Sequence, residues 1–239
     1  MKKFYDYVII PLLISALIIG LIISSIFSII NYRNRPIQNG KPTYTYLKSM
    51  SVRIECQNFF LEWIGTGIII KITDDFTYIL TNKHVAPKGI GQIGYLNNVV
   101  IDEKEYTFEI IKNDEKYDLS LIRIVGYIPN KRAIKGIKTA SIQDNIYSVG
   151  EYRGLKNIYT QGTLSGYYID SENNNSLIGN IPCAGGCSGS GVFDKDGYLV
   201  ALIYAGFIKE IAKDIFQFDN SKSILIPSYT IKAFLEGVI

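Results

Sequence analysis

The chain is poor in the side chains that bind transition metals. It has one histidine, His84, and three cysteines, Cys56, Cys183 and Cys187, and it has no Cys-x-x-Cys pair. Zinc sites draw several ligands from histidine, cysteine and carboxylate side chains, so we expect no metal site. The small, odd number of cysteines also argues against a disulfide framework. A bridge between Cys183 and Cys187 would close a very tight loop, and we do not expect it.

Clustered positive charge is also missing. The formal net charge is +3, from 25 lysines and arginines against 22 acidic residues, and the basic residues are scattered along the chain. Nucleic-acid-binding proteins gather such residues on one face, so we expect no nucleic-acid partner. Hydrophobic residues make up 47% of the chain, which is enough to bury a sizeable core. Tyrosine and isoleucine are abundant and alanine is scarce, a balance that favours strands.

Residues 8–30 lack any charge and are predominantly apolar. At a rise of about 1.5 Å per residue, a helix of this length crosses a hydrocarbon core about 30 Å thick. The apolar region of a cleaved signal peptide is about 7–15 residues long and ends at a small-x-small site, and this run fits neither feature. A buried core helix is a weaker alternative, because the run is apolar on nearly every face. We predict a membrane anchor at residues 1–35 that contacts the lipid bilayer through residues 8–30.

The flanks of the anchor do not decide its orientation. Lys2 and Lys3 precede the apolar run, and Arg33, Arg35 and Lys41 follow it. The positive-inside rule compares these two sets, and they nearly balance.

Residues 36–47 are mostly polar, contain two prolines and show little periodicity, so we predict a linker there. From residue 48 onward, apolar runs recur at about 8–12-residue spacing between polar turns, which predicts an all-β barrel or sandwich. One set of strands falls within residues 48–127 and a second within residues 140–227. Apolar residues then recur at helical spacing, which predicts a short helix at residues 228–237.

Three motifs carry the chemistry: TNKHV at 81–85, DLSLI at 118–122 and GCSGS at 186–190. Glycine-rich loops such as the last can aim backbone N–H groups into one hollow, as an oxyanion hole requires, although alone such a loop also fits an ordinary turn. The three motifs place a histidine, an aspartate and a serine in that chain order. With GTG at 65–67 and ILIPSYTI at 224–231, the sequence resembles the chymotrypsin-like serine proteases, especially the bacterial trypsin-like and HtrA-type branch.

The resemblance implies a fold and a mechanism. The fold is two six-stranded antiparallel β-barrels with a short C-terminal helix, forming a protease domain at residues 48–239. The mechanism is acyl transfer to Ser188, with His84 as general base and then general acid, and with Asp118 orienting the imidazole. The backbone N–H groups of Gly186 and Ser188 would form the oxyanion hole. The substrates would be proteins or peptides, and no cofactor or metal is implied.

The resemblance also places a substrate-binding strand. Ile203, Tyr204, Ala205 and Gly206 lie where the family pairs an extended substrate with the enzyme. Residues 180–183, in the wall before the nucleophile, carry no acid. Cleavage after Lys or Arg therefore has no obvious electrostatic support, and the apolar lining leans towards small aliphatic side chains before the scissile bond.

The sequence departs from the family pattern at Cys187, where trypsins have an aspartate, and at Ser190, where glycine is usual. Without that aspartate, activation through an ion pair with a new N-terminus is not expected. Cys187 also leaves open a cysteine protease, since viral relatives use Gly-x-Cys-Gly, although the Gly-x-Ser-Gly frame favours Ser188. A further alternative is a catalytically silent module of the same fold that binds extended peptides by strand addition.

The location of the domain is predicted mainly from the resemblance. Anchored HtrA-type proteases usually face the cell envelope, so we expect a single-pass membrane protein with its protease domain outside the cytoplasm. Three cysteines without expected partners fit a reducing compartment slightly better. The linker would hold the cleft near the bilayer and favour membrane-proximal substrates.

Overall fold

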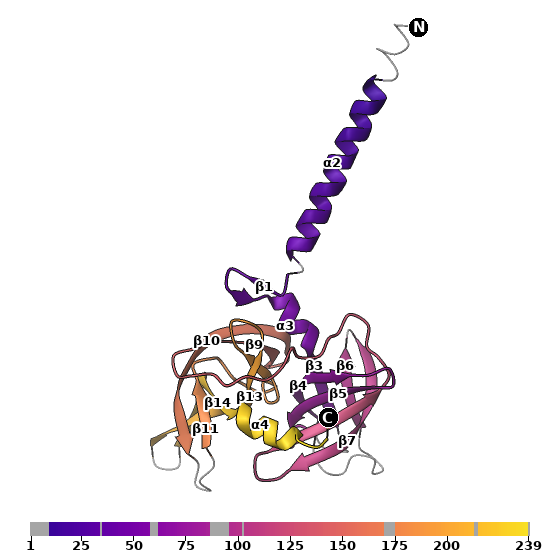
Figure 1. Cartoon of the computed structure of the whole chain (residues 1–239). Helices are drawn as coiled ribbons and strands as arrows, with labels where there is room; N and C mark the ends of the chain where they lie inside the picture. Colours follow the sequence, from indigo (N-terminus) through magenta and orange to yellow (C-terminus); the bar gives the residue numbers. More distant parts are fainter. Residues whose placement is uncertain are drawn as a thin grey trace, which may run out of the picture. The chain divides into compact units, whose positions relative to one another are not determined.

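The computed structural model describes residues 10–33, 35–57, 62–86, 96–101, 103–169, 175–212 and 215–238. They belong to two compact units, Met1–Pro36 and Ile37–Ile239. Figure 1 labels most of the helices and strands.

Helix α2 (Ile10–Arg33) is the element that the structure describes in the first unit. Its 24 residues span about 36 Å at 1.5 Å per residue, enough to cross a bilayer. Within it, residues Ile14–Tyr32 have a mean hydropathy of 2.3, and none of this stretch is buried. The helix therefore fits a single-pass membrane anchor. Val8 and Ile9 of the predicted run, with Lys2 and Lys3 before it, lie outside the described residues.

The second unit begins earlier than the sequence suggests. Strands β1 (Ile37–Gln38) and β2 (Lys41–Pro42) pair across Asn39 and Gly40. Both turn residues have positive φ, at 51° and 69°, which is the geometry that Asn-Gly favours in a tight hairpin. This ribbon occupies the first part of the region predicted to be a linker.

Helix α3 (Tyr44–Met50) follows the ribbon directly. Thr43 caps it, because its side-chain oxygen accepts a hydrogen bond of 3.2 Å from the Tyr46 N–H. Leu47 and Met50 are completely buried in the core. The prediction of a linker at residues 36–47 is therefore wrong here: a helix of seven residues is too short to show helical periodicity, but its two buried side chains hold it to the domain.

Barrel one is a closed antiparallel sheet with the strand order β3-β4-β5-β8-β7-β6. Its strands are β3 (Ser51–Gln57), β4 (Glu62–Ile72), β5 (Phe76–Asn82), β6 (Leu96–Ile101), β7 (Lys104–Asp114) and β8 (Leu119–Val125). Alternate side chains enter the barrel, as Val52, Ile54 and Cys56 do from β3, and the residues between them are less buried.

Barrel two is a second closed antiparallel sheet, with the strand order β10-β11-β14-β13-β12-β9. Its strands are β9 (Asn145–Tyr152), β10 (Leu155–Ile169), β11 (Asn175–Gly179), β12 (Gly191–Phe193), β13 (Leu199–Ala212) and β14 (Ile215–Pro227). Helix α4 (Ser228–Leu235) follows β14. Two six-stranded antiparallel barrels and a short C-terminal helix confirm the predicted fold class.

A cluster of buried apolar side chains lies between the barrels. It combines side chains of both barrels with Leu47 and Met50 of α3 and with Ile231 and Phe234 of α4. Lys112 on β7 donates a hydrogen bond of 2.6 Å from Nζ to the Phe234 carbonyl, so α4 is tied to barrel one as well. Figure 1 shows α4, in yellow, at the junction of the barrels. Both helices thus help to fix one barrel against the other.

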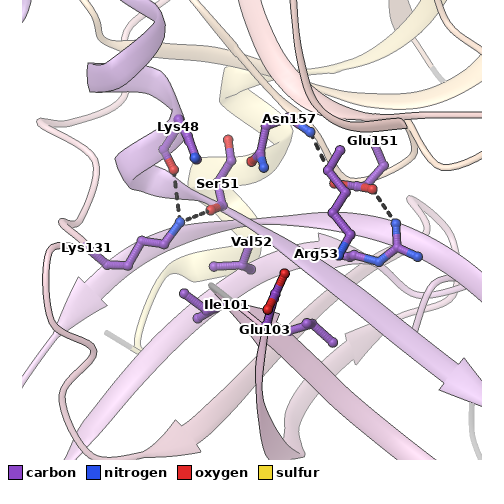
Figure 2. A pocket seen from close by; sticks show the side chains of 11 residues that line it. Lys48, Ser51, Val52, Arg53, Ile101, Glu103, Lys131, Glu151 and Asn157 are labelled. Atoms are coloured by element: carbon purple, nitrogen blue, oxygen red, sulfur yellow. Dashed lines mark hydrogen bonds and ion pairs between the residues drawn. The ribbon is translucent and has the colours of Figure 1, made fainter. Parts of the chain in front are cut away.

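An ion pair also joins the barrels. Glu151 on β9 is only 3% exposed, and one of its carboxylate oxygens accepts a hydrogen bond from Arg53 on β3. Its other oxygen accepts from the Asn157 N–H at 3.3 Å. Arg53 also pairs with Glu55 on its own strand. Figure 2 shows Glu151 between Arg53 and Asn157, beside a cavity of about 180 Å³.

This geometry predicts unequal roles for the two partners of Arg53. Glu151→Gln removes the buried charge, and we expect the free energy of unfolding to fall by about 3 kcal/mol, as when a buried pair loses one partner. Glu55→Gln, whose side chain is 31% exposed, should cost less than about 1 kcal/mol. Urea denaturation of the full chain in detergent measures both losses. Equal losses would contradict Glu151 as the main partner.

Candidate active site

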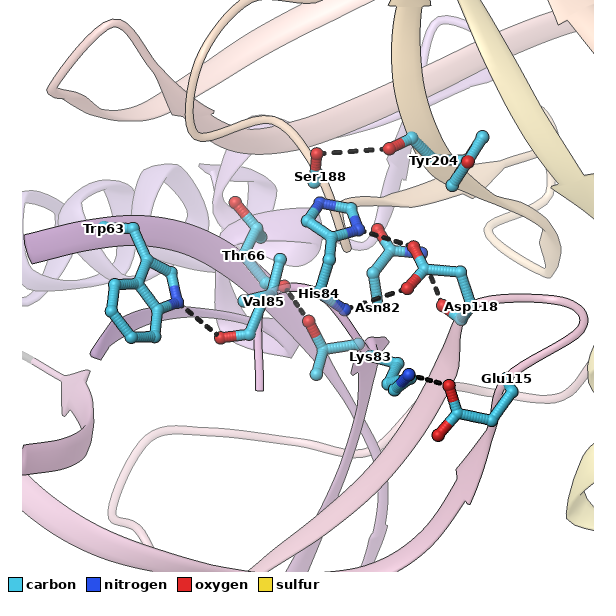
Figure 3. Close-up of polar contacts among 11 residues, drawn as sticks. Trp63, Thr66, Asn82, Lys83, His84, Val85, Glu115, Asp118, Ser188 and Tyr204 are labelled. Carbon is cyan, nitrogen blue, oxygen red and sulfur yellow. Dashed lines mark hydrogen bonds and ion pairs between the residues drawn. The ribbon is translucent and has the colours of Figure 1, made fainter. Parts of the chain in front are cut away.

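His84 and Asp118 meet because two neighbouring strands end at the same place. In the antiparallel pair β5 and β8, Asn82 lies opposite Leu119. His84 follows Asn82 by two residues, and Asp118 immediately precedes Leu119, so both lie just beyond the same edge of barrel one. His84 Nδ1 lies 2.5 Å from Asp118 Oδ2, and the His84 N–H donates to Asp118 Oδ1 at 2.8 Å (Figure 3).

The backbone of Asp118 is held in an uncommon conformation. Its φ is +52°, in the left-handed region, where aspartate is one of the better-tolerated side chains. Its carbonyl accepts hydrogen bonds from the Lys83 N–H at 3.0 Å and from Asn82 Nδ2 at 3.1 Å. The Asp118 side chain is 19% exposed, whereas the His84 side chain is 49% exposed. The carboxylate thus fixes one imidazole nitrogen, and the other remains available to the solvent-facing cleft.

Ser188 lies in the turn that leads into β12. Its hydroxyl donates a hydrogen bond of 3.2 Å to the Tyr204 carbonyl on β13. The Tyr204 ring contacts the His84 ring edge-on, with centroids 6.2 Å apart. In the described part of the chain Ser188 makes no hydrogen bond to His84, although both line one cleft (Figure 3).

Thr66 on β4 of barrel one holds this turn of barrel two in place. Its N–H donates to the Ser188 carbonyl at 2.9 Å, and its hydroxyl donates to the Gly186 carbonyl at 3.0 Å. The same hydroxyl oxygen accepts from the Glu151 N–H at 3.0 Å. The Thr66 carbonyl accepts from the Thr81 hydroxyl at 2.7 Å. One buried residue therefore connects the histidine strand with the serine turn.

Two glycines make this close approach possible. At Gly189, where φ is +85°, a Cβ would overlap the Thr66 carbonyl and the Thr81 hydroxyl. At Gly150 on β9, a Cβ would overlap the Ser190 hydroxyl. Ser190, one of the two departures from the family pattern, thus occupies space that Gly150 leaves open.

Among the described residues, two backbone N–H groups of this turn have no protein acceptor. The N–H groups of Cys187, Gly189 and Ser190 donate to the carbonyls of Ala184, Ile203 and Cys187. Those of Gly186 and Ser188 donate to no atom of the described residues.

The direction of the Gly186 N–H follows from the preceding peptide group. The Gly185 carbonyl accepts from the Arg153 N–H at 2.7 Å. The C=O and N–H of a trans peptide group point in opposite directions. The Gly186 N–H therefore lies on the side of this peptide group opposite to the Arg153 backbone N–H.

Cys183 and Cys187 form a disulfide, so the expectation that they would not is wrong. The chain folds back between them, with the Cys187 N–H donating to the Ala184 carbonyl at 3.0 Å. This turn brings the two Cα atoms to 5.7 Å, within the usual range for a bridge, which the sequence separation alone does not reveal. Cys56 is the free cysteine, buried in barrel one, where burial raises the pKa of its thiol to about 12.

The cleft beside Ser188 has a volume of about 640 Å³. Of the predicted substrate-binding residues, Tyr204, Ala205 and Gly206 line it. Ile203 does not: its side chain is buried, and its backbone N–H and carbonyl bond to Ser190 and Gly189. The sequence analysis did not predict the charged and amide side chains of the lining, namely Glu115, Arg153 and Asn220.

Strand β13 presents an edge to this cleft. It pairs with β12 as far as Leu202, which lies opposite Gly191, and it pairs with β14 on its other side. Beyond Leu202, residues 204–206 therefore face the cleft along an edge that β12 does not cover.

A family model for the trypsin-like peptidase domain matches residues 65–202, which include His84, Asp118 and Ser188. The chain belongs to the trypsin-like peptidase family. As a member of this family, it is 28% identical over 155 residues to a protein named serine protease HtrA-like from Staphylococcus haemolyticus (strain JCSC1435). That match covers 59% of this chain and 24% of the relative.

Two further proteins are similar to this chain, one in sequence and one in structure. The chain is 31% identical over 106 residues to the magnetosome formation protease MamE of Paramagnetospirillum magneticum (strain ATCC 700264 / AMB-1), covering 44% of this chain and 14% of MamE. It thus spans about a quarter or less of these curated relatives. The solved HtrA-type protease AlgW with a tripeptide matches with a TM-score of 0.66 at 18% identity, covering 83% of this chain and 64% of that one. At this identity the likeness shows the fold alone, which is that of an HtrA-type protease.

The thiols give a direct test of the geometry. When the unreduced protein is alkylated at pH 8 and digested, peptides containing Cys183 and Cys187 should appear linked. Cys56 should stay unmodified, because a thiol with a pKa of about 12 is almost wholly protonated at this pH and this one is buried. Alkylation in urea is the control, and it should label Cys56. An alkylated Cys183 or Cys187 in the unreduced sample would contradict the bridge.

Proposed function

We propose that this trypsin-like peptidase is a membrane-anchored serine endopeptidase that hydrolyses peptide bonds through Ser188, His84 and Asp118. The observation that carries the proposal is that the His84–Asp118 pair and Ser188 line one cleft. A serine hydroxyl is a weak nucleophile unless a neighbouring base takes its proton. His84 is the chain's one imidazole, and Asp118 holds it by Nδ1.

The proposed reaction begins with a rotation of the Ser188 side chain. At rest its hydroxyl donates to the Tyr204 carbonyl. An extended peptide added to the open edge of β13 would offer this carbonyl a backbone N–H, and the serine hydroxyl would then turn to His84 Nε2. The peptide-bound form of AlgW is consistent with a peptide substrate here.

Proton transfer and bond exchange then follow. His84 Nε2 takes the hydroxyl proton as Ser188 Oγ attacks the scissile carbonyl, and Asp118 stabilises the imidazolium. The N–H groups of Gly186 and Ser188, which have no acceptor in the described protein, would bind the oxyanion. His84 gives the proton to the leaving amine, and water releases the acyl group by the same steps in reverse. No cofactor enters this scheme.

The cysteine-protease alternative has little support. The sulfur of Cys187 is bonded to that of Cys183, so it offers no thiolate, and the residue is 5% exposed. The silent peptide-binding module remains the second candidate, and the open edge of β13 favours it as much as the enzyme. The two differ in whether Ser188 reacts.

A fluorophosphonate probe separates these candidates. We expect it to label the full chain, and we expect Ser188→Ala to abolish labelling and to reduce peptide hydrolysis by about 10⁴-fold or more. Ser165→Ala, at an exposed serine on β10, is the control and should label normally.

The double variant Cys183→Ser/Cys187→Ser should still label. A folded wild-type protein that never labels would favour the binding module, and labelling lost only in the cysteine variant would favour Cys187.

The proposed organisation is an anchor at residues 1–36 and a protease domain at residues 37–239, outside the cytoplasm. The length and hydropathy of α2 support the anchor. The Cys183–Cys187 disulfide supports the location, because such bonds persist mainly in oxidising compartments. The cysteines therefore favour the envelope side, contrary to what they suggest when counted as unpaired.

Protease-accessibility mapping tests the location. Added protease should digest residues 37–239 when the outer face of the anchoring membrane is exposed, and should spare them in sealed inverted vesicles. A cytoplasmic marker protein controls for sealing. Digestion in the inverted vesicles alone would place the domain in the cytoplasm.

A further inference from the structure

The cleft beside Ser188 contains one charge that no carboxylate of the described chain neutralises. Its lining residues with acidic or basic side chains are His84, Glu115, Asp118 and Arg153. Asp118 pairs with His84, and Glu115 pairs with Lys83. Within the described residues, Arg153 makes no ion pair, so its guanidinium gives this wall a net positive charge.

The backbone of Arg153 is fixed beside the nucleophile. Arg153 and Gly154 form the two-residue turn between β9 and β10, with φ values of +50° and +81°, and Tyr152 pairs with Leu155 on either side. The Arg153 N–H donates to the Gly185 carbonyl, three residues before Ser188. The side chain therefore starts from a defined point on the cleft wall.

The guanidinium end is held as well. In the amide orientation that satisfies both groups, the Asn220 side chain accepts from Arg153 Nη2 at 2.8 Å and donates to the Cys183 carbonyl at 3.3 Å. The Asn220 backbone carbonyl also accepts from the Cys183 N–H at 3.1 Å. Arg153 is thus tied through Asn220 to residues 183–185, the wall that leads into Ser188.

The guanidinium lies over the Tyr152 ring, 6.0 Å from its centroid, and most of its N–H donors are not used within the described residues. An arginine has five N–H donors, and the contact with Asn220 uses one. The facing residues Ala184, Gly185, Ala205 and Gly206 bring no charge. A planar guanidinium in such a setting binds a carboxylate through two parallel hydrogen bonds.

We propose that Arg153 selects an acidic side chain, Asp or Glu, on the residue whose carbonyl Ser188 attacks. The inference rests on the proposed function and names its substrate class: peptides cleaved after an acidic residue. It replaces the expectation of small aliphatic residues. That expectation rested on residues 180–183, whereas Arg153, about 30 residues earlier in the chain, adds a positive charge to the cleft.

Matched peptides test this selectivity on the full chain in detergent. Four fluorogenic peptides would differ at one position, with Glu, Gln, Val or Lys before the scissile bond. Charge-assisted hydrogen bonds predict that kcat/KM for Glu exceeds that for Gln by about 10- to 100-fold. In Arg153→Gln this ratio should fall to within about threefold of unity, and Arg153→Glu should favour Lys over Glu. Lys195→Gln, an equal change of charge at an exposed turn residue that does not line the cleft, should keep the wild-type ratio.

The outcomes separate this proposal from the proposed function. A protein that labels with fluorophosphonate but prefers Val or Lys, or whose Arg153→Gln variant keeps the Glu/Gln ratio, would overturn the acidic selectivity and leave the protease intact. If no peptide is cleaved, binding decides: fluorescence anisotropy would compare Glu and Gln peptides on the Ser188→Ala protein. Tighter Glu binding that is lost in Ser188→Ala/Arg153→Gln supports the role of Arg153. Equal binding overturns it.

Discussion

The arrangement of the cleft depends on the hydrogen bonds that Thr66 makes across the junction of the barrels. Serine and histidine come from different barrels, so neither barrel alone can set the distance between them. Thr66 uses its N–H, its carbonyl and its hydroxyl for this purpose, and it reaches the serine turn, the histidine strand and β9. Gly189 lets it approach, since any side chain there would overlap it. The buried apolar side chains within and between the barrels stabilise the fold. The contacts of Thr66 align the serine turn with the histidine strand.

Much of this architecture could be predicted from the sequence because it is encoded locally. Apolar runs between polar turns predicted an all-β barrel or sandwich, and the resemblance to the chymotrypsin-like proteases implied two barrels. The uncharged run predicted helix α2, which fits a membrane anchor. The motifs around His84, Asp118 and Ser188 lie at strand ends, where the sheet register places them. Asp118 joins His84 because β5 and β8 are neighbours, which the resemblance implied and the pairing of Asn82 with Leu119 shows.

The features that escaped prediction depend on contacts between distant residues. Helix α3 has seven residues and two buried side chains, too few for a periodic signal, so it passed for a linker. The disulfide needs a turn at Ala184 that the spacing of the cysteines does not reveal. Arg153 reaches the cleft from a hairpin turn and contacts Asn220 on β14. No local sequence pattern predicts this contact. The lining of the cleft is therefore the part of the candidate site that was hardest to predict from the sequence.

Under the proposed function, the hydrogen bond from Ser188 to the Tyr204 carbonyl would keep the resting nucleophile inactive, because its proton is not directed at His84. A protease anchored in a membrane, as proposed for this chain, would be at a higher local concentration relative to other copies of itself than a freely diffusing enzyme. Brief collisions with a neighbour's loops would find the nucleophile disarmed. A chain that lies along β13 long enough to take over the carbonyl would release it. Under the proposed function, the time that a neighbouring chain stays on β13 would then limit self-cleavage.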